Sequence, residues 1–158
     1  MNTKEILETI KMIQDENLDI RTVTLGISLL DCMDSDIDAA CEKVYEKIVR
    51  TAKNLVPVCE QIETELGIPI INKRISVTPI GIVASPCKEQ NPVKFALTLE
   101  KAAMEVGVNF IGGYSALVEK GFAGADRALI ESIPEGTPLS EALYTFTNGH
   151  LKHGLEQL

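Results

Sequence analysis

The sequence lacks several features that would point directly to a function. None of its four cysteines stands in a C-x-x-C pair, so it has neither the spacing of a zinc ribbon nor that of a thioredoxin-like motif. No apolar run approaches the ~18–20 residues that span a bilayer. Fifteen basic and 23 acidic residues give a net charge of −8 with no basic cluster. This balance argues against nucleic acid or an anionic membrane as partner.

The N-terminal residues and the cysteines together predict a cytoplasmic protein. The first ten residues, MNTKEILETI, mix acidic and basic side chains and contain no apolar core of a secretory signal. Cys41 and Cys59 fall on or near the apolar stripe of helical sequence, where a reduced cysteine acts as a small hydrophobic residue. Reduced thiols are typical of the cytosol.

The hydrophobic pattern alternates between helices and strands along 158 residues, a length typical of one domain. Alternating apolar residues predict strands at about 21–30, 72–79 and 108–114, with a less certain strand and loop at 80–90. Helical spacing predicts helices at 3–16, 36–66, 92–106, near 115–120 and 124–132, and from 137 onward. This order predicts an α/β fold with a mostly parallel sheet and crossover helices.

Local signals predict where the helices begin and end. Thr3 is the expected N-cap of the first helix, and Ser35 with Asp38 resembles a capping box before the longest one. Gly67 is expected to end that longest helix. Pro57 lies inside it and removes a backbone donor, so we expect either a kink or two abutting helices.

Four aspartates lie at the start of the longest predicted helix, namely Asp31, Asp34, Asp36 and Asp38. An EF-hand loop that starts at Asp34 needs glycine at position 39 and glutamate at position 45, but the sequence has Ala39 and Tyr45 there. The favoured interpretation is that these carboxylates stabilise the positive N-terminus of the helix. A carboxylate or Mg²⁺ site is the alternative, and no metal ligand is assigned.

Ligands of open α/β sheets bind beyond the carboxyl ends of the strands, and the three predicted ends carry small or polar residues. They suit a small anionic metabolite, with the candidate binding residues Ser28, Asp31, Arg74, Ser76, Thr78, Gly112, Gly113 and Ser115. Arg74 and its neighbour Lys73 either form ion pairs at the surface, or Arg74 points into a cavity as a fork for carboxylate or phosphate. The Gly112-Gly113 pair either presents N–H groups to an anion before a helix or makes a tight turn that needs glycine.

A second hypothesis is an enzyme, a lyase or acyl transferase that uses a thiol. Cys32 is the best candidate nucleophile because it follows the end of the first predicted strand. Its neighbour Asp31 is expected to raise the pKa of the thiol, which argues against a reactive thiolate. His150, His153 and Glu156 lie in a glycine-containing tail, where a metal-binding helix face is not expected.

Three segments together carry a family resemblance: DIRTVTLGISLLDC at 19–32, INKRISVTPI at 71–80 and VNFIGGYSALVEKG at 108–121. With ELGIP at 65–69, they resemble the uncharacterised protein family 0210, also called domain of unknown function 711. The resemblance covers about residues 1–134. Residues 135–158 depart from it and are expected to form a helical tail packed on the same domain. The resemblance implies part of a pyruvate formate-lyase-like α/β barrel, and it implies neither an activity nor a cofactor.

The last expectation concerns assembly. The apolar stripe from Ile37 to Leu66 occupies about 30 residues, or ~45 Å of helix, which is more than a small sheet covers. Three or four parallel strands also leave an edge of the sheet open. The sequence therefore predicts a homodimer or higher oligomer, with the long helix or the open edge in the interface. A structural, oligomeric scaffold is thus a third hypothesis, and a monomer covered by its own C-terminal tail is the alternative.

Overall fold

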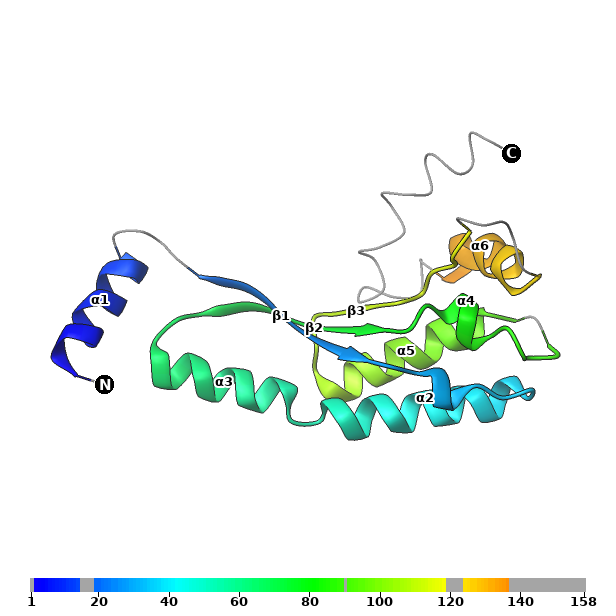
Figure 1. The fold of residues 1–158 in the computed structure, drawn as a ribbon, viewed down its shortest axis with the longest axis horizontal. Coiled ribbons are helices and arrows are strands. Elements are labelled where there is room, and N and C mark those ends of the chain that lie inside the picture. Colours follow the sequence, from blue (N-terminus) through cyan, green and yellow to red (C-terminus); the bar gives the residue numbers. More distant parts are fainter. Residues whose placement is uncertain (1, 15–18, 90, 119–123, 137–158) are drawn as a thin grey trace.

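The computed structural model describes residues 2–14, 19–89, 91–118 and 124–136 and arranges most of them as a sheet with helices on one side (Figure 1). The strands β1 (Ile20–Ile27), β2 (Ile70–Val77) and β3 (Phe110–Gly112) are parallel and adjacent in that order. The helices are α1 (Thr3–Gln14), α2 (Ile37–Ala52), α3 (Leu55–Leu66), α4 (Ile80–Val83), α5 (Val93–Val106) and α6 (Gly124–Gly136), with a short 3₁₀ helix, η1 (Leu30–Cys32). The α/β class, the parallel sheet and the crossover helices are confirmed. The described strands form an open sheet, so the pyruvate formate-lyase-like barrel stays a prediction.

The helices α2, α3 and α5 lie along one side of the sheet (Figure 1). The core is between them and the strands, where Val44 and Ile48 of α2, Phe95 and Leu99 of α5, and Ile75 of β2 are buried. The helices α4 and α6 lie beyond the carboxyl ends of the strands, and α1 lies beyond their amino ends (Figure 1). None of the helices in the described ranges has both the length and the apolar character that crossing a bilayer requires.

The two faces of the sheet differ as the alternation in the sequence predicts. On β1, Ile27 is buried against the helices and Leu25 packs on the core, whereas Thr24 and Gly26 are exposed on the opposite side. We call this opposite side the outer face of the sheet. The register between β1 and β2 has a constant offset, from Ile20 beside Ile70 to Ile27 beside Val77, so their outer-face residues lie side by side. The outer face therefore carries mostly small and polar side chains.

The long helical stretch is two abutting helices, one of the two outcomes expected. The break falls at Lys53 and Asn54, between α2 and α3, and not at Pro57. Pro57 is the third residue of α3, a position where a backbone N–H has no partner within the helix, so proline costs little there. Gly67 ends α3 as expected, with φ 69° in the left-handed region.

Two caps differ from those expected. The first helix is capped by Asn2 and not by Thr3, because the Asn2 side chain accepts the Glu5 N–H (3.0 Å) while the Glu5 carboxylate accepts the Asn2 N–H (2.8 Å). The helix α2 is capped by Asp36, whose carboxylate accepts the Asp38 N–H (2.9 Å). In both places the side chain that caps the helix lies one position away from the expected residue.

Two segments were assigned the wrong structure. Residues 80–83 form the short helix α4, not a strand, because the chain turns at Pro79 instead of extending the sheet. Residues 115–118 are not helical, and the neighbouring residues 119–120 lie outside the described part of the chain. The helix expected from 137 onward, and with it the proposed tail of residues 135–158, also lies almost wholly outside the described residues.

The apolar stripe is covered within the chain on α2 but not on α3. Ile37, Val44 and Ile48 are at most 3% exposed. On α3, by contrast, Cys59 of the stripe is buried, but the exposed fraction is 36% for Ile62 and 44% for Leu66. The excess apolar surface expected from the sequence is therefore confined to the second of the two helices.

An ion pair joins α3 to the start of β2. Lys73 points toward the helices, and its Nζ lies 3.4 Å from each carboxylate oxygen of Glu63. Glu63 also accepts the Ile70 N–H at 2.6 Å. These two donors, the Ile70 N–H first, lower the pKa of Glu63 below its ordinary value of 4.5. The carboxylate therefore fixes the angle at which the chain leaves α3 and enters the sheet.

We expect Glu63→Gln to lower the free energy of unfolding more at pH 7 than near pH 3. A carboxylate whose pKa is lower in the folded than in the unfolded state stabilises the fold above the unfolded pKa, and this stabilisation is lost as the pH falls through the folded pKa. Urea denaturation at both pH values measures the difference. Glu60→Gln, on the exposed side of the same helix, is the control. An equal effect of Glu63→Gln at both pH values would contradict the assignment.

Candidate functional site

Thr78 ties together the carboxyl ends of β1 and β2. Its hydroxyl accepts the Leu29 N–H at 3.0 Å, and its own N–H donates to the Ile27 carbonyl at 3.3 Å. Thr78 is half-buried. It follows directly after β2 and continues the every-second-residue series of Arg74 and Ser76, as the sequence predicts. Its hydroxyl thus holds the two strand ends in place, and its role in binding a ligand stays a prediction.

The Gly112-Gly113 turn is built for close packing. Gly113 has φ 130°, and a Cβ atom there would collide with the Val77 side chain and lie 2.8 Å from the Val77 carbonyl oxygen. The Gly113 carbonyl accepts two N–H groups at 2.8 Å, from Ile80 and from Ser115. No helix begins at this turn, because residues 113–118 have no regular structure. The helix dipole that the anion-binding interpretation requires is therefore absent, and the geometry favours a tight turn.

Ser115 and Asp31 are placed away from the outer face. The Ser115 carbonyl accepts the Gly81 N–H at 3.1 Å, so Ser115 anchors α4 to the chain beyond β3. Asp31 forms an ion pair with Lys47 of α2, on the helix side, and this hydrogen bond lowers the pKa of Asp31. The structure therefore does not bring these two candidates beside Arg74.

Lysine side chains form ion pairs with aspartates that follow β1. Lys43 lies 2.7 Å from Asp34 and lowers the pKa of that carboxyl to about 2, and Lys94 lies 2.9 Å from Asp38. Asp36 caps α2. Within the described ranges, no three histidine, cysteine, aspartate or glutamate side chains gather as a metal site. The positions of Asp36 and Asp38 fit the interpretation in which the acids stabilise the start of a helix.

Arg74 lies on the outer face, in the middle of the sheet. In the strand register it stands between Thr24 of β1 and Phe110 of β3, and the next outer-face row consists of Gly26, Ser76 and Gly112. Lys73 points to the other side and pairs with Glu63, as alternation along a strand requires. The structure thus brings together three candidate residues, Arg74, Ser76 and Gly112. Ser28 is exposed beyond the end of β1.

The guanidinium group of Arg74 is held by an aromatic ring. Its Cζ lies 4.8 Å from the centroid of the Phe110 ring, within the range of a cation–π contact. The Nε atom is buried and has no hydrogen-bond partner. Phe110 was not among the residues singled out in the sequence, because it is 36 positions from Arg74. The signal that could have found it is the alternation of the third strand, since Phe110 and Gly112 fall on one face.

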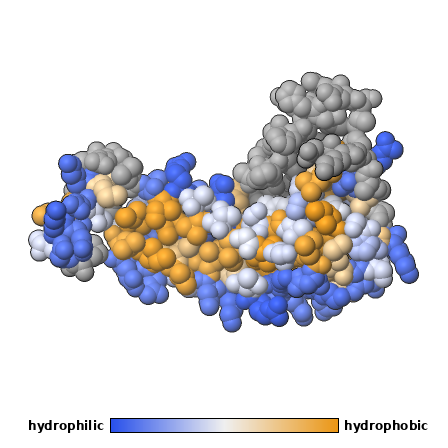
Figure 2. Space-filling model, in the orientation of Figure 1, coloured by the Kyte–Doolittle hydropathy of each residue, from blue (hydrophilic) through white to orange (hydrophobic). Residues whose placement is uncertain are grey.

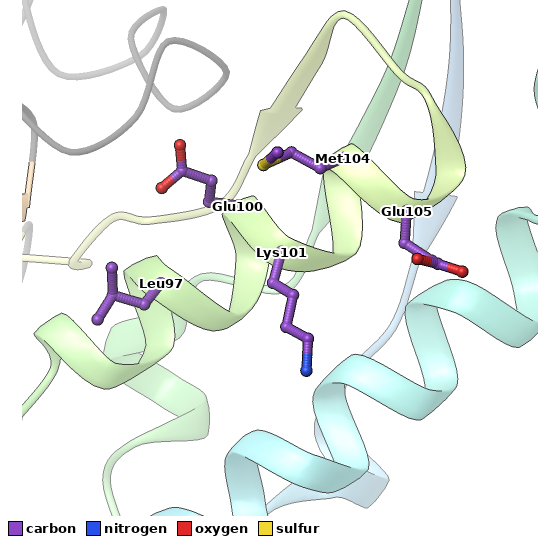
Figure 3. Close-up of a pocket in the computed structure, with 5 residues that line it drawn as sticks. All are labelled: Leu97, Glu100, Lys101, Met104 and Glu105. Carbon is purple, nitrogen blue, oxygen red and sulfur yellow. The ribbon is translucent and has the colours of Figure 1, made fainter.

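Two depressions formed by described residues lie on the helix side of the sheet. One, of about 480 Å³, is lined by Leu97, Glu100, Lys101, Met104 and Glu105, all on α5 (Figure 3). A second, of about 340 Å³, lies between α2 and α5, where Lys101 also stacks on the Tyr45 ring at 4.5 Å. Neither is at the carboxyl ends of the strands.

Cys32 does not have the environment of a nucleophile. It is 3% exposed, and its Sγ lies 3.8 Å from Asp31 Oδ1 and 3.6 Å from the Lys43 carbonyl oxygen. Burial, followed by the charge of Asp31, raises the pKa of the thiol above its ordinary value of 9.0. The observed geometry thus gives no support to the thiol-dependent enzyme.

Comparison with known proteins identifies a single family. The family model described as "Uncharacterised ACR (DUF711)" matches residues 11–156, and so extends past residue 134, where the resemblance seen in the sequence ends. A UPF0210 protein of Ligilactobacillus salivarius is 62% identical over 85% of this chain and 30% of its own length. UPF0210 proteins of Listeria monocytogenes and Clostridium botulinum are 60% and 55% identical over 94% and 98% of this chain. The chain spans about a third of the length of these curated relatives.

We expect Gly113→Ala to lower the free energy of unfolding by at least about 2 kcal/mol. The cost combines an unfavourable backbone conformation with a collision against Val77. Gly107 also has a positive φ, of 75°, but a Cβ there would meet nothing within 4 Å, so Gly107→Ala should cost only about 1–2 kcal/mol. Gly26→Ala should cost nothing measurable, since the space there is open. Urea denaturation of the three variants checks the order, and equal losses would contradict it.

We expect all four native cysteines to react slowly with iodoacetamide at pH 7. Each thiol is buried, and burial raises the pKa of each above 9.0. Mass spectrometry of tryptic peptides, compared with protein labelled in urea, measures the protection at each site. Rapid labelling confined to Cys32 would contradict the prediction and revive the thiol hypothesis.

Proposed function

The chain belongs to the DUF711 family, and we propose that it binds a small anionic molecule on the outer face of its sheet, with Arg74 as the anchor. The observation that carries this proposal is the buried Nε of Arg74, which has no hydrogen-bond partner. A donor withdrawn from water without an acceptor costs ~1–3 kcal/mol, and more when it is charged. An anion bound at the edge of the guanidinium group would remove the cost if the side chain shifts enough to present Nε to it. Carboxylate and phosphate match the planar fork of arginine and are the favoured groups.

Phe110 supports the proposal by fixing the guanidinium plane. The ring covers one face of the guanidinium group at 4.8 Å, and a stacked guanidinium still offers the N–H groups at its edge. A cation held in one orientation loses less conformational entropy when a ligand binds. Phe110 would therefore act as a positioning residue for Arg74.

The charge around Arg74 also favours an anion. Among the strand residues of the outer face, Arg74 is the only charged one. Its neighbours in the register are Thr24 and Phe110, and none of the ion pairs within the described residues includes it. No carboxylate on these strands competes with a ligand. A positive charge with no acidic neighbour on these three strands is notable in a chain whose net charge is −8.

The row of small residues beside Arg74 leaves room for a ligand. Gly26 and Gly112 have no side chains, and a Cβ on Gly26 would meet nothing within 4 Å. Ser76 stands between them in the register and is exposed, so its hydroxyl can donate to an anion or accept from it. Two residues of a strand rise ~6.6 Å, so Arg74 and Ser76 can reach one small molecule from adjacent rows. Ser28 and Thr78 lie one step further along the same direction.

We also propose a cytoplasmic location. All four cysteines are free and buried, although the chain carries enough of them for two disulfides. Free thiols persist in reducing compartments, and this is the property that supports the proposal.

A thermal-shift screen of small carboxylates and phosphates tests the binding function. A ligand present at a hundredfold excess over its Kd stabilises the fold by about 2.7 kcal/mol. For a chain of this size, that is a rise in Tm of several degrees. The panel includes acetate, pyruvate, citrate and inorganic phosphate at millimolar concentrations. The absence of any shift across the panel would contradict the proposal.

Substitution of Arg74 locates the site. We expect Arg74→Gln to weaken binding of the best anion at least about tenfold, because it removes a charge-assisted hydrogen bond. Arg74→Lys should bind with intermediate affinity, since it keeps the charge but not the planar fork. Arg50→Gln is the matched control, because Arg50 is exposed on α2, on the other side of the sheet. Isothermal titration calorimetry measures the affinities, and unchanged binding by Arg74→Gln would place the anion elsewhere.

A further inference from the structure

The positive charge that the described strands offer to an anion on the outer face is a single unit. It comes from Arg74, the only charged residue on that face of the three strands. The neighbouring Lys73 points to the helix side, where it pairs with Glu63. The Gly112-Gly113 turn adds no helix dipole, because residues 113–118 have no regular structure. One negative charge on a ligand is therefore matched, and a second has no counterpart on these strands.

The carboxylates of the neighbouring helix lie on the other side of the core. Glu42 and Glu46 are exposed on α2, which covers the helix side of the sheet (Figure 1). Hydrophilic side chains accordingly line the helix side of the molecule in Figure 2, below an apolar band. The net charge of −8 opposes each further negative charge on a ligand at long range. Charge at both short and long range thus favours a monoanion.

A hydroxyl group stands in the row next to Arg74. Ser76 follows it by two positions on β2, shares its face, and is exposed. In the register it lies between Gly26 and Gly112, which have no side chains to cover or engage the hydroxyl. The two rows are ~6.6 Å apart along the strand. A polar group one or two carbons from a carboxylate bound at Arg74 can therefore reach Ser76.

The other polar neighbours of Arg74 are less suited to this contact. The Asn72 amide donates to the Arg21 carbonyl at 3.0 Å, so it is engaged within the sheet. Thr24 stands beside Arg74 on β1, but the guanidinium group lies over the Phe110 ring of β3, on the opposite side. The stacked guanidinium therefore presents its edge away from Thr24.

We propose that the ligand of this face is a monocarboxylate with a hydroxyl one or two carbons from its carboxylate, and that Ser76 is the specificity-determining residue. This inference rests on the proposed function, in which Arg74 is the anchor. The carboxylate matches the edge of the guanidinium in shape and in charge. The Ser76 hydroxyl then donates to the ligand's hydroxyl or accepts from it. Dicarboxylates and phosphate monoesters bring a second charge, whose removal from water these strands do not compensate.

Matched ligands test the proposed class on the unmodified chain. Racemic 3-hydroxybutyrate differs from butyrate by one hydroxyl, and succinate differs from butyrate by a second carboxylate at the same chain length. We expect 3-hydroxybutyrate to bind at least about threefold more tightly than butyrate, the gain of one neutral hydrogen bond. Succinate should bind no more tightly than butyrate. Isothermal titration calorimetry at pH 7 and constant ionic strength measures the three affinities. Equal affinities for 3-hydroxybutyrate and butyrate, or a preference for succinate, would overturn the proposal.

Substitutions of Ser76 assign the preference to its hydroxyl. Ser76→Ala should abolish the preference for 3-hydroxybutyrate and leave the affinity for butyrate unchanged. Ser76→Thr keeps a hydroxyl and should retain the preference. Ser85→Ala is the matched control, because Ser85 is exposed and lies outside the strands. Circular dichroism checks that each variant is folded. A preference that survives in Ser76→Ala would contradict the assignment.

The failure of this inference can be told apart from the failure of the proposed function. If Arg74→Gln weakens both ligands but Ser76→Ala changes neither, Arg74 remains the anchor and the assignment of Ser76 is wrong. If the unmodified chain binds neither butyrate nor 3-hydroxybutyrate but binds inorganic phosphate through Arg74, the ligand class alone is wrong. If it binds no carboxylate and no phosphate, both proposals are wrong.

Discussion

Right-handed connections between neighbouring parallel strands must pass on the same side of their sheet. Because β1, β2 and β3 follow one another in chain order, α2, α3 and α5 all collect on that side and enclose the core there. The opposite face receives no such helix from the described residues. The residues that face outward are accordingly polar or small, with Arg74 at the centre. The core and the candidate binding surface are thus two consequences of one rule of chain connection.

Elements with one buried side could be predicted well from the sequence. The alternation of Leu25 and Ile27 with Thr24 and Gly26 identified β1 and its outer face, and the regular stripe after Ile37 identified the paired helices. Where a segment is buried on all sides, its hydrophobic residues show no periodicity that distinguishes a strand from a helix. Residues 80–83 were assigned to a strand for this reason, because their apolar side chains are mostly buried and fit a strand or a short helix equally well.

The candidate site could be predicted only in the residues that share a strand. Arg74 and Ser76 are two positions apart on β2, so alternation alone places them together. Phe110 reaches Arg74 only through the register of β2 with β3, which depends on how the intervening α5 packs. Thr78 and Gly113 have roles set by single contacts, with Leu29 and Val77, that no local pattern encodes. The contacts between residues far apart in the chain are thus the part of the candidate site that could not be predicted from the sequence.

The constant register between β1 and β2 also affects the order in which the chain folds. From Ile20 beside Ile70 to Ile27 beside Val77, every pair in this ladder joins residues 50 positions apart, so no part of it can form locally. The entropy of closing that loop is lost before the first strand contact compensates for it, which slows folding. The helices α2 and α3 lie within the loop and shorten it when they form. Helices that form early in this loop would therefore bring the two strands closer together before they pair.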